Sequence, residues 1–126
     1  MTGQYPLELL GDGQQTRCFT HVKDIANGVI TVAQHKNGQN RDFNVGSDKE
    51  IKMIDLAKKI WEVMEIKKPF KVKFIPGLKF DIKRRVPNVA KIRSLIGWQQ
   101  EVKFEDGLKE VVLWLKEQKA RGKLKR

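Results

Sequence analysis

The stretch GDGQQTRCFTHVKD, residues 11–24, marks the change from extended to helical chain on which the predicted fold depends. Its two glycines flank Asp12 and are typical of a tight turn after a short strand, which is predicted over residues 5–11. A helix begins near Val22, because apolar residues then recur every three or four positions. Arg17 stands alone between the turn and the helix. Since nothing in a strand–loop–helix unit requires an arginine there, Arg17 is the first candidate functional residue.

The length of 126 residues is enough for one domain with a modest hydrophobic core. We expect this domain to cover residues 1–119 and a basic tail to follow over residues 120–126. No segment approaches the ~18 apolar residues of a membrane span, and the N-terminus has no secretory signal pattern. The single cysteine, Cys18, excludes an internal disulfide and is typical of a reducing compartment. The sequence therefore predicts a soluble, cytoplasmic protein that does not bind membranes.

The formal net charge is +11, and the basic residues are unevenly spread. Residues 67–93 contain ten basic residues and one acidic residue, and residues 116–126 contain six and one. A lysine-rich solvated surface accounts for most of them, but a site for nucleic acid or for a polyanionic small molecule would have the same composition. Nucleic acid is the less favoured partner, because the aromatic residues lie in apolar patterns and are predicted to be in the core: Phe43, Trp61, Phe74, Trp98, Phe104 and Trp114.

Hydrophobic periodicity predicts the remaining elements. Ser47 and Glu50 stand three residues apart before a periodic run, which is the spacing of a capping box, and they predict that a helix begins there. Asn88 is expected to cap a later, short helix. The pattern predicts a small α/β domain with few short strands and about four helices: strand 5–11, helix 22–33, strand 41–46, helix 51–64, strand 70–75, loop 76–87, helix 88–96 and helix 104–115.

The residues on their own indicate no catalytic centre and no metal site. Gly11 and Gly13 begin a dinucleotide fingerprint, but Thr16 stands where the third glycine is needed and no long helix follows directly. The only tyrosine, Tyr5, has no lysine four residues later. The remaining metal-ligand types make at most a poor set: Cys18, His21 and His35. We therefore predict no catalytic residue and no metal ligand in this chain.

Four blocks of the sequence resemble, in this order, the C-terminal part of the extended short-chain dehydrogenases: PLELLGDGQQTRCFTHVKDIANGVITVA (6–33), FNVGSDKEIKMIDLAKKI (43–60), DIKRRVPNVAKIRSLIGW (81–98) and FEDGLKEVVLWLKE (104–117). These are NAD-dependent nucleotide-sugar epimerases, dehydratases and decarboxylases. The block over residues 81–88 is most similar to the branch with UDP-sugar epimerases and UDP-glucuronate decarboxylases. In that family the NAD fingerprint, the catalytic Ser/Thr and the Tyr-x-x-x-Lys pair lie in an N-terminal Rossmann part, which has no counterpart in this sequence.

The resemblance implies that two arginines hold a diphosphate. Arg17 matches the family arginine that contacts the diphosphate of the nucleotide sugar, and a planar guanidinium can donate two hydrogen bonds to phosphate oxygens. Arg85, with Arg84 as the alternate, matches a second arginine that reaches the diphosphate or the ribose from the other side. The structural alternative for this second position is a loop arginine that pairs with Asp81.

The resemblance also places Glu8 and Leu10 on a strand that runs beside the nucleotide base, although Leu10 replaces a tyrosine or similar residue common there. It implies a nucleotide-sugar-binding lobe of an NAD-dependent epimerase/dehydratase, which is expected to be inactive alone and to bind no NAD alone. A Rossmann-domain partner or self-association is expected. The alternatives are a basic nucleic-acid-binding module and an accessory domain that completes a separate Rossmann chain.

Overall fold

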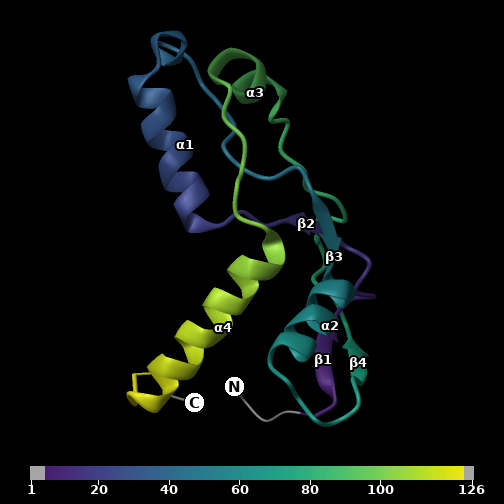
Figure 1. Ribbon diagram of the computed structural model, residues 1–126. Helices are drawn as coiled ribbons and strands as arrows, with labels where there is room; N and C mark the ends of the chain where they lie inside the picture. Colours follow the sequence, from purple (N-terminus) through teal and green to yellow (C-terminus); the bar gives the residue numbers. More distant parts are fainter. Residues whose placement is uncertain (1–4, 124–126) are drawn as a thin grey trace.

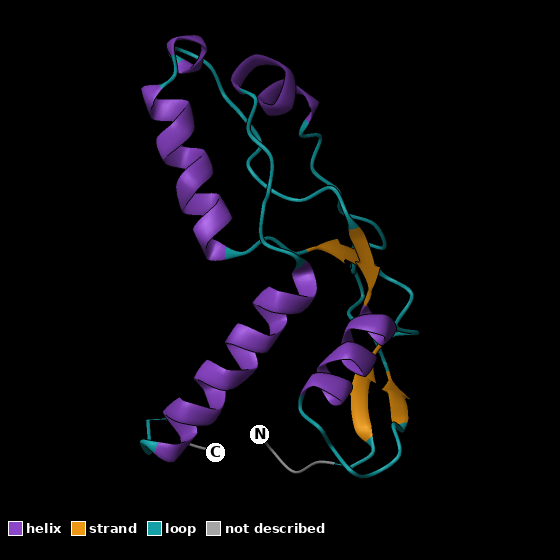
Figure 2. Ribbon diagram, viewed as in Figure 1, coloured by secondary structure: helices purple, strands orange, loops and turns teal. Residues whose placement is uncertain are grey.

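The computed structural model describes residues 5–123, which form a small α/β structure (Figures 1 and 2). The elements in chain order are β1 (Leu7–Leu10), β2 (Thr16–Cys18), α1 (Val22–Gln34), the 3-10 helix η1 (Lys36–Gly38), β3 (Glu50–Lys52), α2 (Met53–Val63), β4 (Val72–Ile75), α3 (Ala90–Ile96) and α4 (Phe104–Ala120). Figure 1 shows α1 and α3 at one end of the molecule, α2 with β1 and β4 at the other, and β2 and β3 between them. The predicted fold class is confirmed. Part of the predicted basic tail, residues 124–126, lies outside the described residues.

The four strands form two separate two-stranded sheets. β1 and β4 pair in parallel from Leu7 with Val72 to Leu10 with Ile75. β2 and β3 pair antiparallel, with Arg17 opposite Ile51. The loop after β4 then returns to β2, because the Thr16 amide donates to the Lys83 carbonyl at 2.8 Å. The strands β2 and β3 and the predicted basic loop, which are distant in sequence, therefore lie side by side.

The hydrophobic core lies at the end formed by α1 and α3. Its buried members are Val89, Ile92, Ile96 and Trp98, and Phe43 packs against them. Gly28 lets α1 approach this cluster, because a Cβ at this position would overlap Val45 and Trp98. The indole N–H of Trp98 also donates to Asn27 Oδ1 on α1 at 3.1 Å. The core thus fixes α1 against α3 and the segment after it.

Asp24 joins the start of α1 to the segment before α4. Its buried carboxylate accepts hydrogen bonds from the backbone amides of Glu101 and Val102, each at 3.2 Å. His21 is the N-cap of the same helix, and its Nδ1 accepts from the Lys23 amide at 3.2 Å. Asp24 and His21 therefore both have structural roles at the start of α1.

The predicted capping box at Ser47 is wrong. Ser47 is buried, and its hydroxyl accepts from the Lys49 amide at 3.1 Å, which forms a local turn. Glu50 belongs to strand β3, and α2 begins only at Met53 with Lys52 as its N-cap. The strand predicted over residues 41–46 is also absent from the structure, whereas β2, which the sequence did not predict, forms because Glu50–Lys52 supplies its partner strand.

The prediction that six aromatic residues lie in the core is wrong for two of them. Trp98 is buried, but Phe74 and Trp114 are 54% and 53% exposed. Phe74 lies on the two-stranded β1–β4 sheet and Trp114 on α4, where no described element covers them. Asn88 Oδ1 accepts from the Ala90 amide at 3.0 Å, but the N-cap of α3 is Val89, so Asn88 lies one residue before the cap position that was predicted for it. None of the helices described here is long and apolar enough to cross a membrane.

Candidate functional site

Arg17 lies on β2 and is held from one side by three hydrogen bonds. Its Nη1 donates to the carbonyl oxygens of Thr16 and Ile82 at 2.8 and 2.7 Å, and its Nη2 donates to Asp81 Oδ1 at 2.9 Å. A guanidinium carries five N–H donors. Among the described residues no acceptor contacts Nε, and the side chain remains 28% exposed. Arg17 is therefore oriented by the protein and still has donors to offer a ligand.

The basic loop, residues 76–87, lies beside Arg17 as the resemblance implies. The loop contacts β2 through Asp81, through the Ile82 carbonyl and through the bridge between Thr16 and Arg84. The predicted site residues Arg17, Arg84 and Arg85 thus come from two segments that the fold brings together. Neither a helix nor a strand continues through the loop. The contacts with β2 therefore hold its irregular backbone in place.

Arg84 is paired with Glu50. Its Nε and Nη2 donate to Glu50 Oε1 at 3.1 and 2.7 Å, and Nε lies 3.1 Å from Oε2. The Thr16 hydroxyl donates to the same Oε2 at 2.7 Å. Asp81, the expected alternative partner of a loop arginine, pairs with Arg17 instead. Arg85 is exposed and has no hydrogen bond or ion pair to any residue in the part of the chain that the structure describes.

Three groups at this site have shifted pKa values. Hydrogen bonds from Arg84 and from Thr16 lower the pKa of the Glu50 carboxyl below its ordinary value, and Glu50 raises the pKa of Arg84. Burial, followed by the negative charges of Glu50 and Asp48, raises the pKa of the Cys18 thiol. Glu50 and Arg84 are therefore charged at neutral pH, and Cys18 is a neutral thiol.

A first prediction concerns acid stability. The carboxyl of Glu50, with an ordinary pKa of 4.5, has a lowered pKa in the folded chain, and the carboxyl of Asp48 is lowered by Arg93 in the same way. A lowered folded pKa gives stability that is present above the unfolded pKa and lost as the pH falls through the folded pKa. We expect the thermal unfolding midpoint, followed by circular dichroism, to fall below pH 4.5. Glu50→Gln should remove part of this dependence, and an unchanged pH profile would contradict the assignment.

Glu8 and Leu10 lie apart from the arginine cluster, which consists of Arg17, Arg84 and Arg85. Both lie on β1, where Glu8 pairs with Lys73 at 3.3 Å and the Leu10 carbonyl accepts from Gln15 Nε2 at 3.1 Å. They line an apolar cavity of about 1020 Å³ between β1 and α2, together with Met53, Leu56, Ile60 and Trp61. The five predicted residues are thus divided between the arginine cluster at β2 and this cavity.

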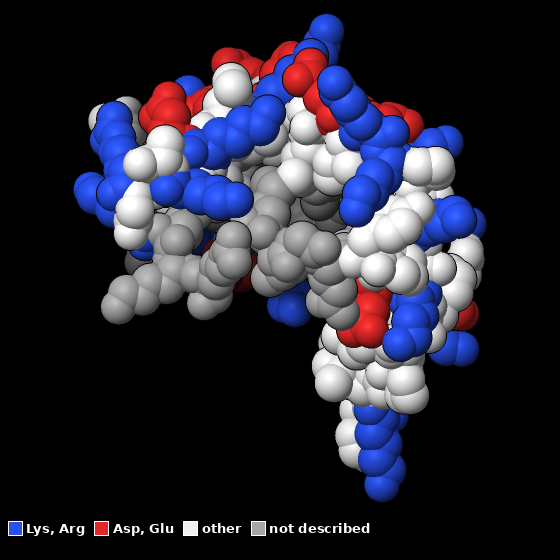
Figure 3. Space-filling model, turned by 90° about the horizontal axis from the view of Figure 1, so that it is seen from below, with Lys and Arg blue, Asp and Glu red and all other residues white. Residues whose placement is uncertain are grey.

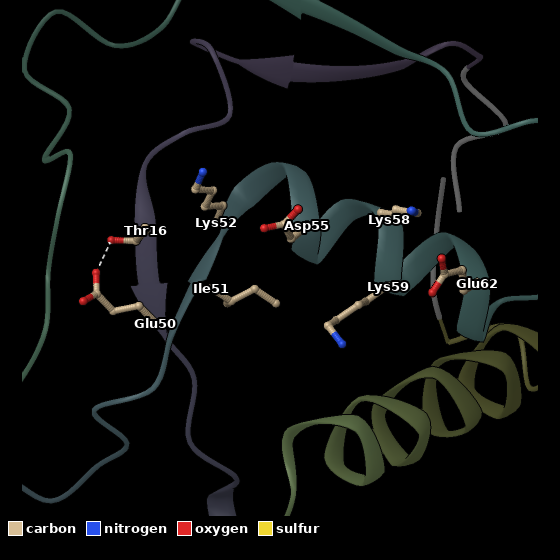
Figure 4. Close-up of a pocket in the computed structure, with 8 residues that line it drawn as sticks. All are labelled: Thr16, Glu50, Ile51, Lys52, Asp55, Lys58, Lys59 and Glu62. Atoms are coloured by element: carbon tan, nitrogen blue, oxygen red, sulfur yellow. Dashed lines mark hydrogen bonds between the residues drawn. The ribbon is translucent and has the colours of Figure 1, made fainter.

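A second, more polar cavity of about 560 Å³ lies beside β2 and β3 (Figure 4). Thr16 and Glu50 line it from the strands, and Asp55, Lys59 and Glu62 line it from α2. Figure 4 shows the Thr16 and Glu50 side chains pointing toward one another.

Sequence reasoning missed Glu50 and Asp81 as members of the site, because Glu50 was interpreted as a helix cap and Asp81 as a partner for another arginine. The one usable signal was that Asp81, Arg84 and Arg85 lie within five consecutive residues of the same loop.

Two further expectations concern cofactors and metals. Gly11 and Gly13 have positive φ values of 70° and lie between β1 and β2, so the turn that they form leads into a strand. The dinucleotide fingerprint needs a helix at that point, whose N-terminus faces the pyrophosphate. This turn therefore does not fit NAD. Within residues 5–123 no three metal-ligating side chains lie close enough together to hold a metal ion.

Comparison with known proteins decides the family. The family model described as GDP-mannose 4,6 dehydratase matches residues 2–111. The chain belongs to this family. A UDP-glucuronate 4-epimerase from Thermodesulfobacterium geofontis is 35% identical over 114 residues, which are 89% of this chain and 34% of the epimerase. The resemblance to NAD-dependent epimerases and dehydratases is confirmed.

Solved structures of this family match the fold closely. An epimerase from Methanothermobacter thermautotrophicus has a TM-score of 0.82 at 31% identity, over 92% of this chain and 34% of that protein. A UDP-N-acetylglucosamine 4-epimerase from Methanobrevibacter ruminantium, in complex with UDP-N-acetylmuramic acid, has a TM-score of 0.78 at 30% identity, over 89% of this chain and 35% of that protein. The chain thus spans about a third of the length of these family members.

Proposed function

We propose that this chain is the nucleotide-sugar-binding lobe of an NAD-dependent epimerase/dehydratase, with Arg17 and Arg85 as the anchors of the ligand's diphosphate. Family membership supports the substrate class, because similar proteins act on UDP-sugars or bind them. In this proposal the lobe binds and orients the nucleotide sugar. The hydride chemistry of the family belongs to NAD and to a Rossmann part, and no residue of this chain takes a catalytic role.

The orientation of Arg17 is the observation that carries the proposal. Its contacts to Asp81 and to the Ile82 carbonyl occupy one part of the guanidinium and leave Nε available. A charged group that is already oriented loses little side-chain entropy on binding, and a guanidinium matches two phosphate oxygens at once. Arg85 follows in the loop that Arg17 contacts, and it is free of partners among the described residues. Two guanidinium groups that reach the same ligand would fit a diphosphate better than a neutral ligand.

Ligand-detected NMR with UDP at low salt tests the proposal directly. We expect saturation transfer to UDP that an excess of unlabelled UDP-glucose abolishes and that generic single-stranded DNA does not. The nucleic-acid alternative predicts the reverse result, with binding that falls steeply as salt rises. Figure 3 shows lysine and arginine side chains spread over the rim of one face, among acidic and uncharged residues. That arrangement is typical of a solvated surface.

The second candidate function, completion of a separate Rossmann chain, is supported by exposed apolar side chains on two helices. Val22, Val29 and Ile30 are exposed on α1, and Leu113 and Trp114 are exposed on α4. Side chains of this kind are normally covered when they lie together on helices. The two functions are compatible, because the same lobe could bind the nucleotide sugar and pack against a Rossmann part.

We expect this apolar surface to cause self-association or binding to an epimerase-like Rossmann partner. Analytical ultracentrifugation should show a mass above that of the monomer which increases with protein concentration. Trp114→Glu should reduce the association, whereas Lys123→Glu, which also adds negative charge at an exposed position, should not. A monomer at all concentrations, with no binding to such a partner, would contradict this prediction.

We also predict that the isolated chain does not bind NAD. The Gly11–Gly13 turn leads into β2, so it provides no helix N-terminus for the pyrophosphate. Titration calorimetry with NAD should give only heats of dilution under conditions in which UDP gives a binding isotherm. A one-to-one isotherm for NAD in the micromolar range would show that the prediction is wrong.

A further inference from the structure

Glu50 lies at the centre of the contacts between β2, β3 and the basic loop. Both of its carboxylate oxygens are used: Oε1 accepts from Nε and Nη2 of Arg84, and Oε2 accepts from Arg84 Nε and from the Thr16 hydroxyl. Figure 4 shows Glu50 facing Thr16 across the paired strands. The Arg84 side chain is 70% exposed, so it reaches Glu50 from the solvent side.

Arg85, the next residue in the loop, differs from Arg84 in its contacts. Arg85 is exposed and has no contact to a carboxylate in residues 5–123, whereas Arg84 has its charge balanced and two of its nitrogens occupied. A phosphate that approached Arg84 would therefore have to compete with a carboxylate that is already bound. The lowered pKa of Glu50 keeps this competitor ionised at neutral pH.

Resting on the proposed function, we infer that Glu50 determines which loop arginine binds the diphosphate: it holds Arg84 in an internal ion pair and leaves Arg85 to act with Arg17. Glu50 is in this sense a specificity-determining residue that acts through Arg84. It also limits the positive charge of the site. The three arginines are offset by Asp81 and Glu50, so the cluster retains only a single net positive charge.

The test is a double-mutant cycle between Glu50 and Arg84, with UDP as the probe in ligand-detected NMR. Glu50→Gln has nearly the same shape but cannot balance a guanidinium, so Arg84 becomes free. We expect UDP to bind about threefold to tenfold more tightly, since an additional cation near two phosphates adds a screened Coulomb attraction. UMP, which has one phosphate, should gain less.

The same cycle tests the role of Arg84. In the unmodified chain, Arg84→Ala should change UDP affinity by less than about twofold, whereas Arg85→Ala should weaken it by about tenfold or more. In the Glu50→Gln background, Arg84→Ala should abolish the gain, so the two substitutions are not additive. Glu117→Gln on α4 makes the same change of charge at an exposed position and should have no effect. Circular dichroism of each variant checks the fold, and the Arg84→Ala arm remains informative if Glu50→Gln is unstable.

Two results would overturn the inference about Glu50 and leave the proposed function intact, provided that UDP binding still depends on Arg17. One is that Arg84→Ala, made in the otherwise unmodified chain, lowers UDP affinity as much as Arg85→Ala does. The other is a Glu50→Gln variant that binds UDP no more tightly than the unmodified chain. Absence of UDP binding by the unmodified chain is a different result, because it overturns the proposed function and this inference with it.

Discussion

Replacing Arg17 with alanine is expected to weaken UDP binding by about tenfold to a hundredfold, because a charge-assisted, bidentate contact contributes about 1.5–3 kcal/mol. Arg17→Lys should recover only part of the loss, since an ammonium keeps the charge and lacks the planar fork. Arg85→Ala should behave like Arg17→Ala. Ligand-detected NMR at low salt is suited to these measurements, because it detects weak complexes.

Arg17 also has a structural role, so this experiment needs a control that breaks one of the same contacts and keeps the guanidinium. Arg17 joins β2 to the basic loop through Asp81 and the Ile82 carbonyl. Asp81→Ala removes the ion pair and keeps the guanidinium, and it should reduce UDP affinity by less than about threefold, since one partly exposed pair contributes little. Lys123→Ala, after α4, should have almost no effect. Equal losses for Arg17→Ala and Lys123→Ala would mean that binding depends on general charge only.

The second large effect is expected in the core, where Ile92→Ala should lower the free energy of unfolding by about 2–5 kcal/mol. Ile92 is 1% exposed and packs with Val89, Ile96 and Trp98. A small domain has a total stability of about 5–15 kcal/mol, so this single change should leave the chain partly unfolded at modest temperature. Urea denaturation followed by tryptophan fluorescence measures the loss.

Ile30→Ala provides the matched control for Ile92→Ala. Ile30 has the same side chain but is 56% exposed on α1, so its removal leaves no cavity. We expect a change within about 0.5 kcal/mol, as for most surface substitutions. If both substitutions destabilise the chain equally, the cluster around Ile92 is not the core that holds α1 against α3.

The elements with strong periodicity were predictable from the sequence. α1 and α4 have long apolar repeats, and β4 has clear alternation with polar residues. β2 was not predictable, because a three-residue strand has too little pattern and forms only where β3 pairs with it. The capping-box interpretation of Ser47 and Glu50 failed for the same reason: pairing with a distant strand determined the backbone at Glu50, and local spacing did not.

The site was predictable in part. The family resemblance led to Arg17 on β2 and to the two loop arginines, and the fold brings that loop to β2. The sequence could not assign Asp81 to Arg17 or Glu50 to Arg84, because these pairs join residues 64 and 34 positions apart. Such pairings depend on how the irregular loop lies on the sheet, and a loop without periodicity gives no signal of its path.

The most direct test of the account is to follow the arginine side-chain Nε–H resonances of the chain in ¹⁵N-edited spectra while UDP is added. If Arg17 and Arg85 anchor a diphosphate, their Nε–H signals should shift together and saturate with one UDP, while the signal of Arg121 beyond α4 should not move. The Arg84 signal, held by Glu50, should shift much less than that of Arg85. Shifts of similar size at Arg121 and Arg17, or none at Arg17, would contradict the proposal that this lobe binds a nucleotide sugar through the arginine cluster.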